Sequence, residues 1–320
     1  MTYFDVFNGD ADGICALLQL RLANPLETTL VTGVKRDIAL VEQVQAKAHD
    51  SVTVLDISMK KNQQSLRHLL AQEVDVFYCD HHQSGDIPDS PRLTALINES
   101  PNVCTSLLIN GHLSSAFPEW AIVGAYGDNL AQSAEALAKK ITLSAKEVAL
   151  LQQLGELFNY NAYGASIEDL HIKPDNLFLQ AKHFAKPQIF CHENKAIYRL
   201  LLDGYQTDMQ QVNGIKADFK TAQSAVYILP DEPFARRSSG VYANSLANQY
   251  PDRAHAILTE RPDQTYLVSV RAPLNNKQGA DKVCSQFATG GGRAAAAGIN
   301  MLAAEELTNF IDCLENYYQQ

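Results

Sequence analysis

Acidic and histidine side chains stand at four separate places in the first 130 residues, each close to the end of an apolar run. They are Asp10 and Asp12 within Asn8-Gly9-Asp10-Ala11-Asp12-Gly13, then Asp56, then Asp80-His81-His82, and finally Asp128. Carboxylates and imidazoles are suitable ligands for Mn²⁺ or a similar divalent ion. Two such ions about 3.5–4 Å apart, bridged by one carboxylate, activate a water and hold both oxygens of a displaced phosphate. Several acids gathered without a cation would repel one another strongly. The pattern therefore predicts a site for divalent metal ions.

Each piece alone has an ordinary structural explanation. Asp-x-Asp-Gly after a strand is often a turn with a helix N-cap, and Asp56 would equally cap a following helix. Adjacent histidines are often a solvated strand end, and Asp128 alone carries almost no information. The four pieces together, each at an element boundary, favour a common site.

The elements that position these residues alternate between strand and helix. Strand patterns cover 3–7, 28–32, 51–56 and 74–79, and helical patterns cover 14–23, 38–48 and 60–72. Such alternation predicts an α/β fold with a parallel sheet and crossover helices. Ligands bind such sheets at the carboxyl ends of the strands, which is where Asp10, Asp56 and Asp80 stand.

The rest of the chain predicts a second, smaller α/β domain. Helical patterns cover 133–158 and, with interruptions, 175–219. Strand patterns then cover 225–229, 256–260 and 266–271, with helices near 242–249 and 304–318. A chain of 320 residues is long for a single core. We expect a catalytic domain over 1–190, a helical connector over 191–220 and a substrate-binding domain over 221–320. An apolar face on the 133–158 helices would support a homodimer.

Composition narrows the class of protein and its partners. With 46% hydrophobic and 19% charged residues, the chain is typical of soluble globular proteins. We expect neither a signal peptide nor a membrane span, and six well-separated cysteines indicate a reducing compartment, so the expected location is the cytoplasm. A net charge of −10 disfavours long nucleic acid as a partner, because its phosphates are usually held by many basic side chains.

These segments resemble the DHH phosphoesterase family, whose signature stands here as Asp80-His81-His82. Toward the C-terminus, Gly290-Gly291-Gly292-Arg293 with the following Ala294–Gly298 resembles the terminal motif of the associated DHHA1 domain. The segments 237–244 and 268–271 resemble earlier parts of the same domain. The resemblance extends from residue 3 to about residue 300.

The resemblance implies a role for each matching residue. Asp10 and Asp56 would hold one ion, and Asp12, Asp56, His81 and Asp128 the second, so that Asp56 bridges them. Asp80 would orient an imidazole, and His82 would assist the leaving oxygen. The implied cofactor is Mn²⁺, with two ions, and Mg²⁺ or Co²⁺ as alternatives.

Two positions depart from the family pattern. Asn8 stands where a histidine ligand usually opens the first motif, and an amide oxygen is the weaker ligand, so loose binding or loss of the first ion is expected. Arg293 stands where the family usually has histidine. Arginine binds phosphate bidentately but cannot act as an acid near neutral pH. The glycine run Gly290, Gly291 and Gly292 would let backbone amides approach an anion, although a simple turn before a helix explains it equally.

The implied activity is hydrolysis of phosphate esters in a cleft between two domains. Arg237, Arg271 and Arg293 indicate a pocket for phosphate or nucleobase. The substrate would be a small nucleotide: a short RNA, a cyclic dinucleotide or a bisphosphorylated nucleoside. Three alternatives stay open: a single-strand exonuclease, an inorganic pyrophosphatase, and a degenerate family member that binds a nucleotide without cleaving it.

Overall fold

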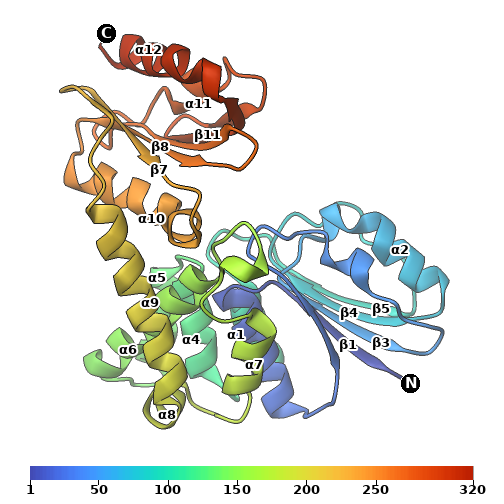
Figure 1. The fold of residues 1–320 in the computed structure, drawn as a ribbon. Coiled ribbons are helices and arrows are strands. Elements are labelled where there is room, and N and C mark those ends of the chain that lie inside the picture. The colour runs from blue at the N-terminus through green and yellow to red at the C-terminus, as the bar shows by residue number, and fades with distance from the viewer. Residues whose placement is uncertain (320) are drawn as a thin grey trace. The chain divides into compact units, whose positions relative to one another are not determined.

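The computed structural model describes residues 1–319 and divides into two compact units, Met1–Tyr205 and Gln206–Gln320 (Figure 1). The division falls within the long helix α9, Lys195–Asn213. It lies inside the predicted connector, whose bounds at 191 and 220 stay a prediction.

The first unit is built on a five-stranded sheet in the order β2-β1-β3-β4-β5. All neighbouring strands pair in parallel, which confirms the predicted α/β architecture. The strands are β1 (Tyr3–Phe7), β2 (Thr29–Thr32), β3 (Ser51–Leu55), β4 (Asp75–Asp80) and β5 (Leu93–Ile97). The strand β5 was not predicted from the sequence; it lies at the sheet edge, where none of its residues is buried.

Alternating side chains of the central strands build two separate cores. Phe7 and Leu55 belong to one buried cluster, and Val6 and Val54 belong to another. Successive side chains of a strand point to opposite faces, so the sheet is covered on both sides. The short amphipathic helix α2 (Gln63–Ala71) contributes buried leucines to the second cluster.

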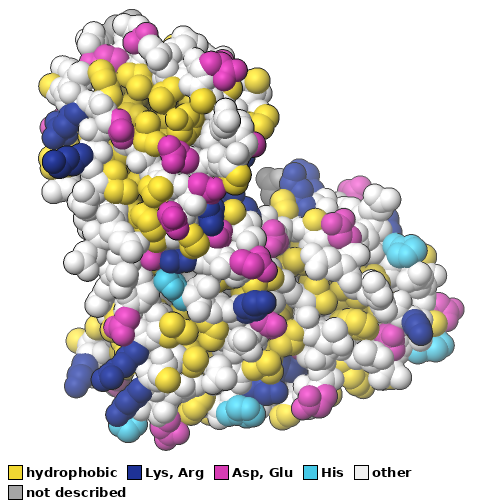
Figure 2. All heavy atoms as spheres, viewed as in Figure 1, with side chains coloured by type: hydrophobic (Ala, Val, Ile, Leu, Met, Phe, Trp, Pro, Cys, Tyr) yellow, Lys and Arg dark blue, Asp and Glu magenta, His cyan; other side chains and the backbone are white. Residues whose placement is uncertain are grey.

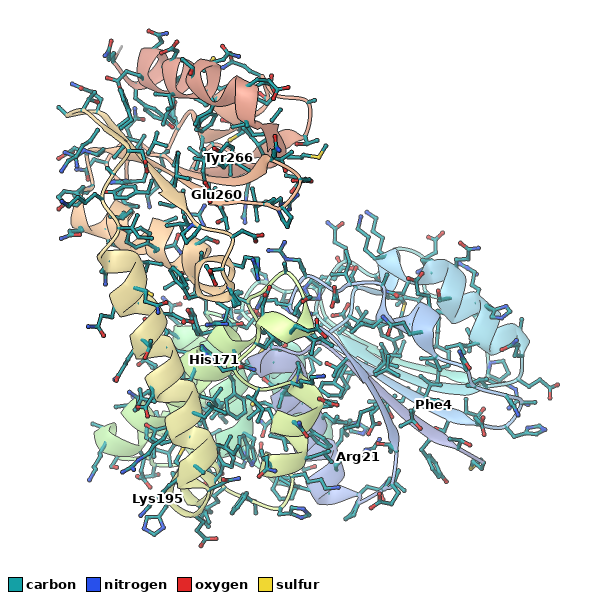
Figure 3. All side chains as sticks on the ribbon, viewed as in Figure 1. Phe4, Arg21, His171, Lys195, Glu260 and Tyr266 are labelled. Atoms are coloured by element: carbon teal, nitrogen blue, oxygen red, sulfur yellow. The ribbon has the colours of Figure 1, made fainter. Side chains whose placement is uncertain are left out.

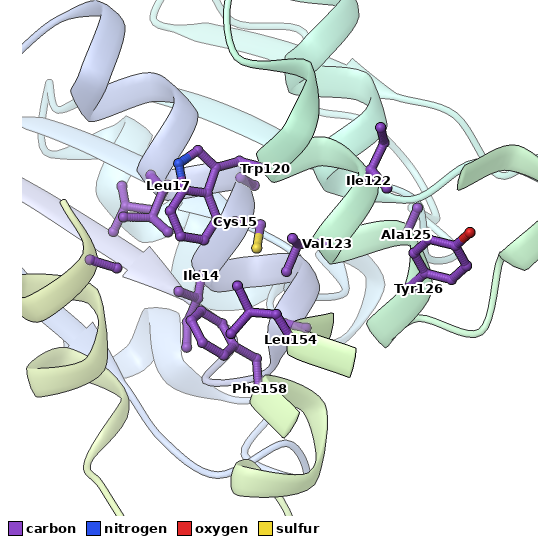
Figure 4. Close-up of a cluster of buried hydrophobic side chains, with 14 of the residues drawn as sticks. Ile14, Cys15, Leu17, Trp120, Ile122, Val123, Ala125, Tyr126, Leu154 and Phe158 are labelled. Atoms are coloured by element: carbon purple, nitrogen blue, oxygen red, sulfur yellow. The ribbon is translucent and has the colours of Figure 1, made fainter. Parts of the chain in front are cut away.

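The larger core packs the sheet against several helices, among them α1 (Ala11–Ala23), α4 (Pro118–Gly127) and α6 (Ala145–Asn161) (Figure 4). Trp120 of α4 is fully buried, and its ring lies 6.3 Å from that of Phe158. The helices α4 and α6 approach closely at Gly155, where an added Cβ would lie 2.3 Å from the Val123 carbonyl oxygen. This core fixes the helices that carry the acidic motifs.

The last turn of α1 is tied to the sheet by an ion pair. Arg21, labelled in Figure 3, donates from Nε to Asp5 Oδ2 at 2.8 Å and from Nη2 to Asp5 Oδ1 at 2.5 Å. Asp5 is fully buried on β1, so this pair sets the position of α1 relative to that strand. The position of α1 matters because its first turn carries Asp12.

Five further helices complete this part of the chain: α3 (Thr105–His112), α5 (Ala131–Lys140), α7 (Pro174–Ala181), α8 (Pro187–Glu193) and α9. The predicted helix over 38–48 is wrong, because only the 3-10 turn Leu40–Gln43 forms and Val44 is already extended. The predicted helical stretch 133–158 is two helices. Thr142 has φ of +61° between them, and a capping box of Ser144 with Glu147 begins the second.

The second unit is built on a six-stranded sheet in the order β10-β11-β9-β8-β7-β6. Only β7 and β8 pair in parallel, and the other neighbours are antiparallel. The strands are β6 (Phe219–Lys220), β7 (Ser224–Leu229), β8 (Ala254–Glu260), β9 (Thr265–Arg271), β10 (Gly290–Arg293) and β11 (Ala296–Ala303). The labelled pair Glu260 and Tyr266 marks where β8 turns into β9 (Figure 3).

Helices cover both faces of this second sheet. Side chains of α11 (Ala280–Cys284) and α12 (Leu307–Tyr318) share one buried cluster with β9 and β11. The helix α10 (Pro233–Gln249) shares another with β7 and β8, and it is longer than the predicted 242–249. The glycine run is not a turn before a helix, because it forms β10, the edge strand of a hairpin with β11.

The described surface agrees with an acidic, globular chain. Lys and Arg side chains stand in small separate groups on the face drawn in Figure 2. Five of the six cysteines are buried, and all six are free thiols. Within the described residues, the helices are too short or too polar to cross a membrane.

Candidate metal centre

The order of the strands brings three acidic motifs to one edge of the first sheet. The strands β1, β3 and β4 are direct neighbours, and their carboxyl ends are joined by backbone hydrogen bonds. The Asn8 N–H donates to the Leu55 carbonyl at 3.3 Å, and the Asp56 N–H donates to the Cys79 carbonyl at 3.1 Å. Asp56 adopts φ of +58°, a left-handed conformation that Asp tolerates better than most residues. Motifs more than 20 residues apart in sequence therefore meet.

Asp12 is held by the first turn of α3. Its Oδ2 accepts the Thr105 N–H at 2.7 Å, and its Oδ1 accepts the Ser106 N–H at 2.8 Å. These amides lie at a helix N-terminus, which favours a negative charge. Thr105 also donates from Oγ1 to Asp56 Oδ1 at 3.3 Å. These contacts fix the position of the Asp12 side chain, which is only 1% exposed.

His81 lies at the centre of the acidic group. Its Nε2 is 3.4 Å from Asp56 Oδ1, 3.7 Å from Asp128 Oδ2 and 4.0 Å from Asp12 Oδ2. Asp128 follows the last residue of α4, so this helix brings the fourth motif to the sheet edge. Three of the predicted carboxylate ligands therefore converge on the fourth predicted ligand, the imidazole nitrogen of His81.

His82 is oriented by Asp80. Asp80 Oδ1 lies 2.8 Å from His82 Nδ1, and this contact raises the pKa of His82 above its usual value, although partial burial acts in the opposite direction. His82 is about half exposed, with a side-chain exposure of 48%, whereas Asp80 is fully buried. Since Nδ1 faces Asp80, Nε2 is the ring nitrogen that faces away from it.

Burial and like charges act together on the remaining acids. The pKa of Asp56 is raised well above its usual value, first by burial and then by Asp10, Asp12 and other carboxylates nearby. Burial, followed by the charges of Asp12 and Asp10, raises the pKa of Asp128 to about 7. The cluster therefore carries more negative charge than its surroundings stabilise.

Asp10 has a different environment from the other acids. Its Oδ1 caps α1 by accepting the N–H groups of Asp12 at 3.0 Å and Gly13 at 3.1 Å. Its Oδ2 accepts from Lys35 Nζ at 2.6 Å. Burial alone would raise the pKa of Asp10, but the Lys35 ammonium outweighs it and the pKa lies below its usual value. Asp10 is therefore a charge-balanced carboxylate.

Asn8 contacts both of these neighbours. Its Oδ1 accepts the Asp10 N–H at 3.2 Å, and its Nδ2 donates to the Lys35 carbonyl at 3.2 Å. Gly13 lies against this loop, since a Cβ there would come 2.2 Å from the Asn8 carbonyl oxygen. Asn8 thus holds the loop after β1 together with Lys35.

The donors fit a divalent ion in two overlapping groups. One consists of Asp12, His81 and Asp128, and the other of Asp56, His81 and His82. In each group one ligand atom per residue lies within 4.8 Å of the others. The buried Asp80 Oδ2 has no hydrogen-bond partner among the described atoms. Surplus negative charge, oxygen and nitrogen donors and partial exposure are what a hard or borderline cation requires.

In the second unit, Arg237 lies in a buried ion pair. Its Nε and Nη2 each donate to the Asp208 carboxylate at 2.7 Å, and Arg237 is 8% exposed. The guanidinium joins α10 to α9 within this unit, and a substrate contact of Arg237 stays a prediction.

Arg271 and Arg293 share a row across the second sheet. Arg271 pairs with Ala296, which pairs with Arg293 on the next strand. Opposed residues of antiparallel strands point to the same face, so the two guanidinium groups flank Ala296, about 10 Å apart at the backbone. Arg271 Nε donates to Asn244 Oδ1 at 2.7 Å. Beside them, Gly291 is open, since a Cβ there would meet nothing within 4 Å.

Three residues of the site were not identified from the sequence. Lys35 follows a glycine and a valine in a loop, and Thr105 and Ser106 begin a helix that was not predicted. Charge balance gives one signal for Lys35, since several acids in one cluster require a cation nearby. The helix start after Cys104 has no comparable signal.

Comparison with known proteins supports this architecture. Residues 223–320 match the model of the DHHA1 domain. Comparison with curated protein sequences finds no match. Among solved structures, exonuclease RecJ bound to manganese superposes with a TM-score of 0.63 at 17% identity, covering 100% of this chain and 90% of that one.

Two further structures differ in length. RecJ from Thermus thermophilus in complex with Mn²⁺ has a TM-score of 0.64 at 16% identity, and the match covers 99% of this chain but 52% of that chain. The pGpG-specific phosphodiesterase PggH from Vibrio cholerae has a TM-score of 0.54 at 15% identity, covering 99% and 98% of the two chains. Residues 223–320 thus match the DHHA1 domain, and the whole chain shares the fold of RecJ and PggH, as the resemblance implied.

Proposed function

We propose that this chain is a divalent-metal-dependent phosphoesterase that acts on small nucleotides or very short oligonucleotides. The observation that carries the proposal is the convergence of Asp12, Asp56, His81 and Asp128 at one sheet edge. That edge belongs to a chain with the DHH/DHHA1 fold.

The ion would be held by Asp12, Asp56, His81 and Asp128, with Mn²⁺ the favoured metal because RecJ structures were solved with it. A divalent ion at such a site supplies Lewis acidity toward the phosphoryl oxygens and lowers the pKa of water. Thr105 and Ser106 fix the Asp12 carboxylate, and Asp56 takes its direction from a left-handed backbone. The protein thus orients its ligands in advance, which costs no rearrangement during reaction.

His82 is the proposed general acid. Asp80 holds Nδ1 and raises the pKa of the ring, so that Nε2 can carry a proton to the leaving oxygen near neutral pH. Arg271 and Arg293 are the proposed substrate contacts in the DHHA1 domain, since the small residue Ala296 lies between them in the sheet and Gly291 beside them leaves open space. The predicted cleft between domains stays a prediction.

A small substrate is favoured by chain length and charge. PggH, which matches over nearly its whole length, is specific for the dinucleotide pGpG, whereas this chain spans only half of Thermus RecJ. A net charge of −10 also disfavours a long polyanion.

The decisive experiment is hydrolysis of a panel of pGpG, short RNAs, cyclic dinucleotides and a 3′,5′-bisphosphorylated nucleoside, with EDTA-treated protein and added Mn²⁺. We expect Mn²⁺-dependent cleavage that falls by at least about 100-fold in Asp128→Asn. The variant His192→Asn, at an exposed position outside the cluster, is the matched control. Equal rates in wild type and Asp128→Asn would refute the proposal.

The second candidate is a nucleotide-binding protein without hydrolytic activity. It is favoured by the environment of Asp10, which already pairs with Lys35, and by a TM-score of 0.50 to CDC45 from Entamoeba histolytica at 9% identity. Binding of a nucleotide from the panel without turnover, at any Mn²⁺ concentration, would establish it.

A further inference from the structure

Lys35 places a positive charge inside the acidic cluster. Its Nζ donates to Asp10 Oδ2 at 2.6 Å and to Asn159 Oδ1 at 2.8 Å, and its side chain is 33% exposed. Asp10 itself is only 3% exposed. The ammonium therefore neutralises a carboxylate that was expected to hold the first of two ions.

The backbone of Lys35 is fixed from two sides, so this contact is not that of a loose surface side chain. The Lys35 N–H donates to the Ala162 carbonyl at 2.9 Å, at the end of α6. The Lys35 carbonyl accepts from Asn8 Nδ2 at 3.2 Å. Asn159, the second partner of the ammonium, is itself held by donating to the Tyr163 hydroxyl at 2.9 Å.

Two of the residues assigned to the first ion, Asn8 and Asp10, are thereby occupied, whereas Asp56 is shared with the second ion. Asn8 Oδ1 accepts the Asp10 N–H, and Asp10 uses Oδ1 to cap α1 and Oδ2 to hold Lys35. Consistently, Asp10 belongs to neither group of converging donors among the described residues. The two ion positions are thus unequal before any ion binds.

We infer that the Lys35 ammonium acts as a built-in cation at Asp10. A divalent ion that binds at Asp10 must displace it, so that two ions bind this chain with clearly unequal affinities. The ion at Asp12, His81 and Asp128 binds without displacing a cation. The ion at Asp10 breaks one charge-assisted hydrogen bond, which weakens its binding by on the order of tenfold to a hundredfold. The inference rests on the metal site of the proposed function.

The test is a Mn²⁺ titration of metal-free protein, with free Mn²⁺ counted by electron paramagnetic resonance. For wild type we expect one tight class and a second class at least about tenfold weaker. In Lys35→Met and in the more conservative Lys35→Gln, the Mn²⁺ affinities of the two classes should differ by no more than about threefold, because the competing charge is gone. The Gln variant keeps a hydrogen-bonding side chain if Met disturbs folding.

Lys60→Met is the matched control for the loss of one positive charge. Lys60 is exposed, and its ammonium contacts Gln83, next to His82, without contacting Asp10. It should leave the ratio of the two affinities unchanged. Two classes of equal Mn²⁺ affinity in wild type would overturn the role of Lys35 but not the metal site. The same conclusion would follow if Lys35→Gln kept the tight class and left the ratio of the two affinities unchanged. No bound Mn²⁺ in any variant would overturn the metal site itself.

Discussion

The ion pair between Arg237 and Asp208 separates a structural role from a substrate-binding role. Replacing Arg237 with Met keeps an unbranched apolar stem but removes two charge-assisted hydrogen bonds of 2.7 Å. Asp208 is 3% exposed, so its carboxylate loses this charge partner in a place that water hardly reaches. Removing one partner of a buried pair costs about 3–5 kcal/mol. We therefore expect a large loss of stability in the unit that begins at Gln206.

Urea denaturation followed by circular dichroism measures this loss. With a slope of about 1–3 kcal/mol per molar urea, the midpoint of the affected transition should fall by roughly 2 M. The double variant Arg237→Met with Asp208→Leu should recover much of the stability, because no buried charge is left alone. Arg271→Met is the control, since that arginine is a proposed substrate contact and should change KM far more than the urea midpoint.

The result that would refute this reasoning is a stable Arg237→Met variant with a raised KM. That result would show that Arg237 contacts substrate, as the sequence indicated.

Three other predictions follow from burial and charge. In EDTA, Asp56→Asn should raise the free energy of unfolding by about 1–3 kcal/mol, because repulsion is relieved and Asn tolerates positive φ, whereas with added Mn²⁺ it should abolish hydrolysis; a destabilised variant in denaturant titration would contradict this. Burial lowers the pKa of His255 to about 4, below the ordinary 6.5, so the unfolded chain takes up the proton first. Stability should therefore fall by up to about 3 kcal/mol between pH 6.5 and 4, and His255→Gln should flatten that slope, unlike His192→Gln. Gly155→Ala should lower the melting temperature by several degrees, because its Cβ would meet the Val123 carbonyl; an unchanged melting temperature would show that α4 and α6 can separate freely.

Much of the first unit followed from local patterns. The apolar strand β3 is followed directly by Asp56, β4 ends on Asp80, and Asp10 lies just past β1. This pattern predicted acidic side chains at one shared edge, and the family resemblance implied which of them would be ligands. The edge strand β5 and the turn at 40–43 were missed, because a short, partly exposed strand and a 3-10 turn carry weak periodicity. Local patterns identify buried elements better than edge elements.

The partners of the site residues could not be predicted in the same way. The contacts of Lys35 with Asp10, and of Arg237 with Asp208, join residues 25 and 29 positions apart. Nothing in their spacing indicates a pair, since the contacts depend on how loops and helices pack. Arg237 is an example, because an arginine in a family motif has the same sequence signal whether it binds substrate or forms a buried ion pair.

The central claim is that a divalent ion binds among Asp12, His81 and Asp128. Crystals grown with Mn²⁺ test it most directly through the anomalous signal of manganese. The account predicts a peak at bonding distance from His81 Nε2 and from a carboxylate oxygen of both Asp12 and Asp128. A peak confined to other residues, or none at full Mn²⁺ saturation, would contradict it.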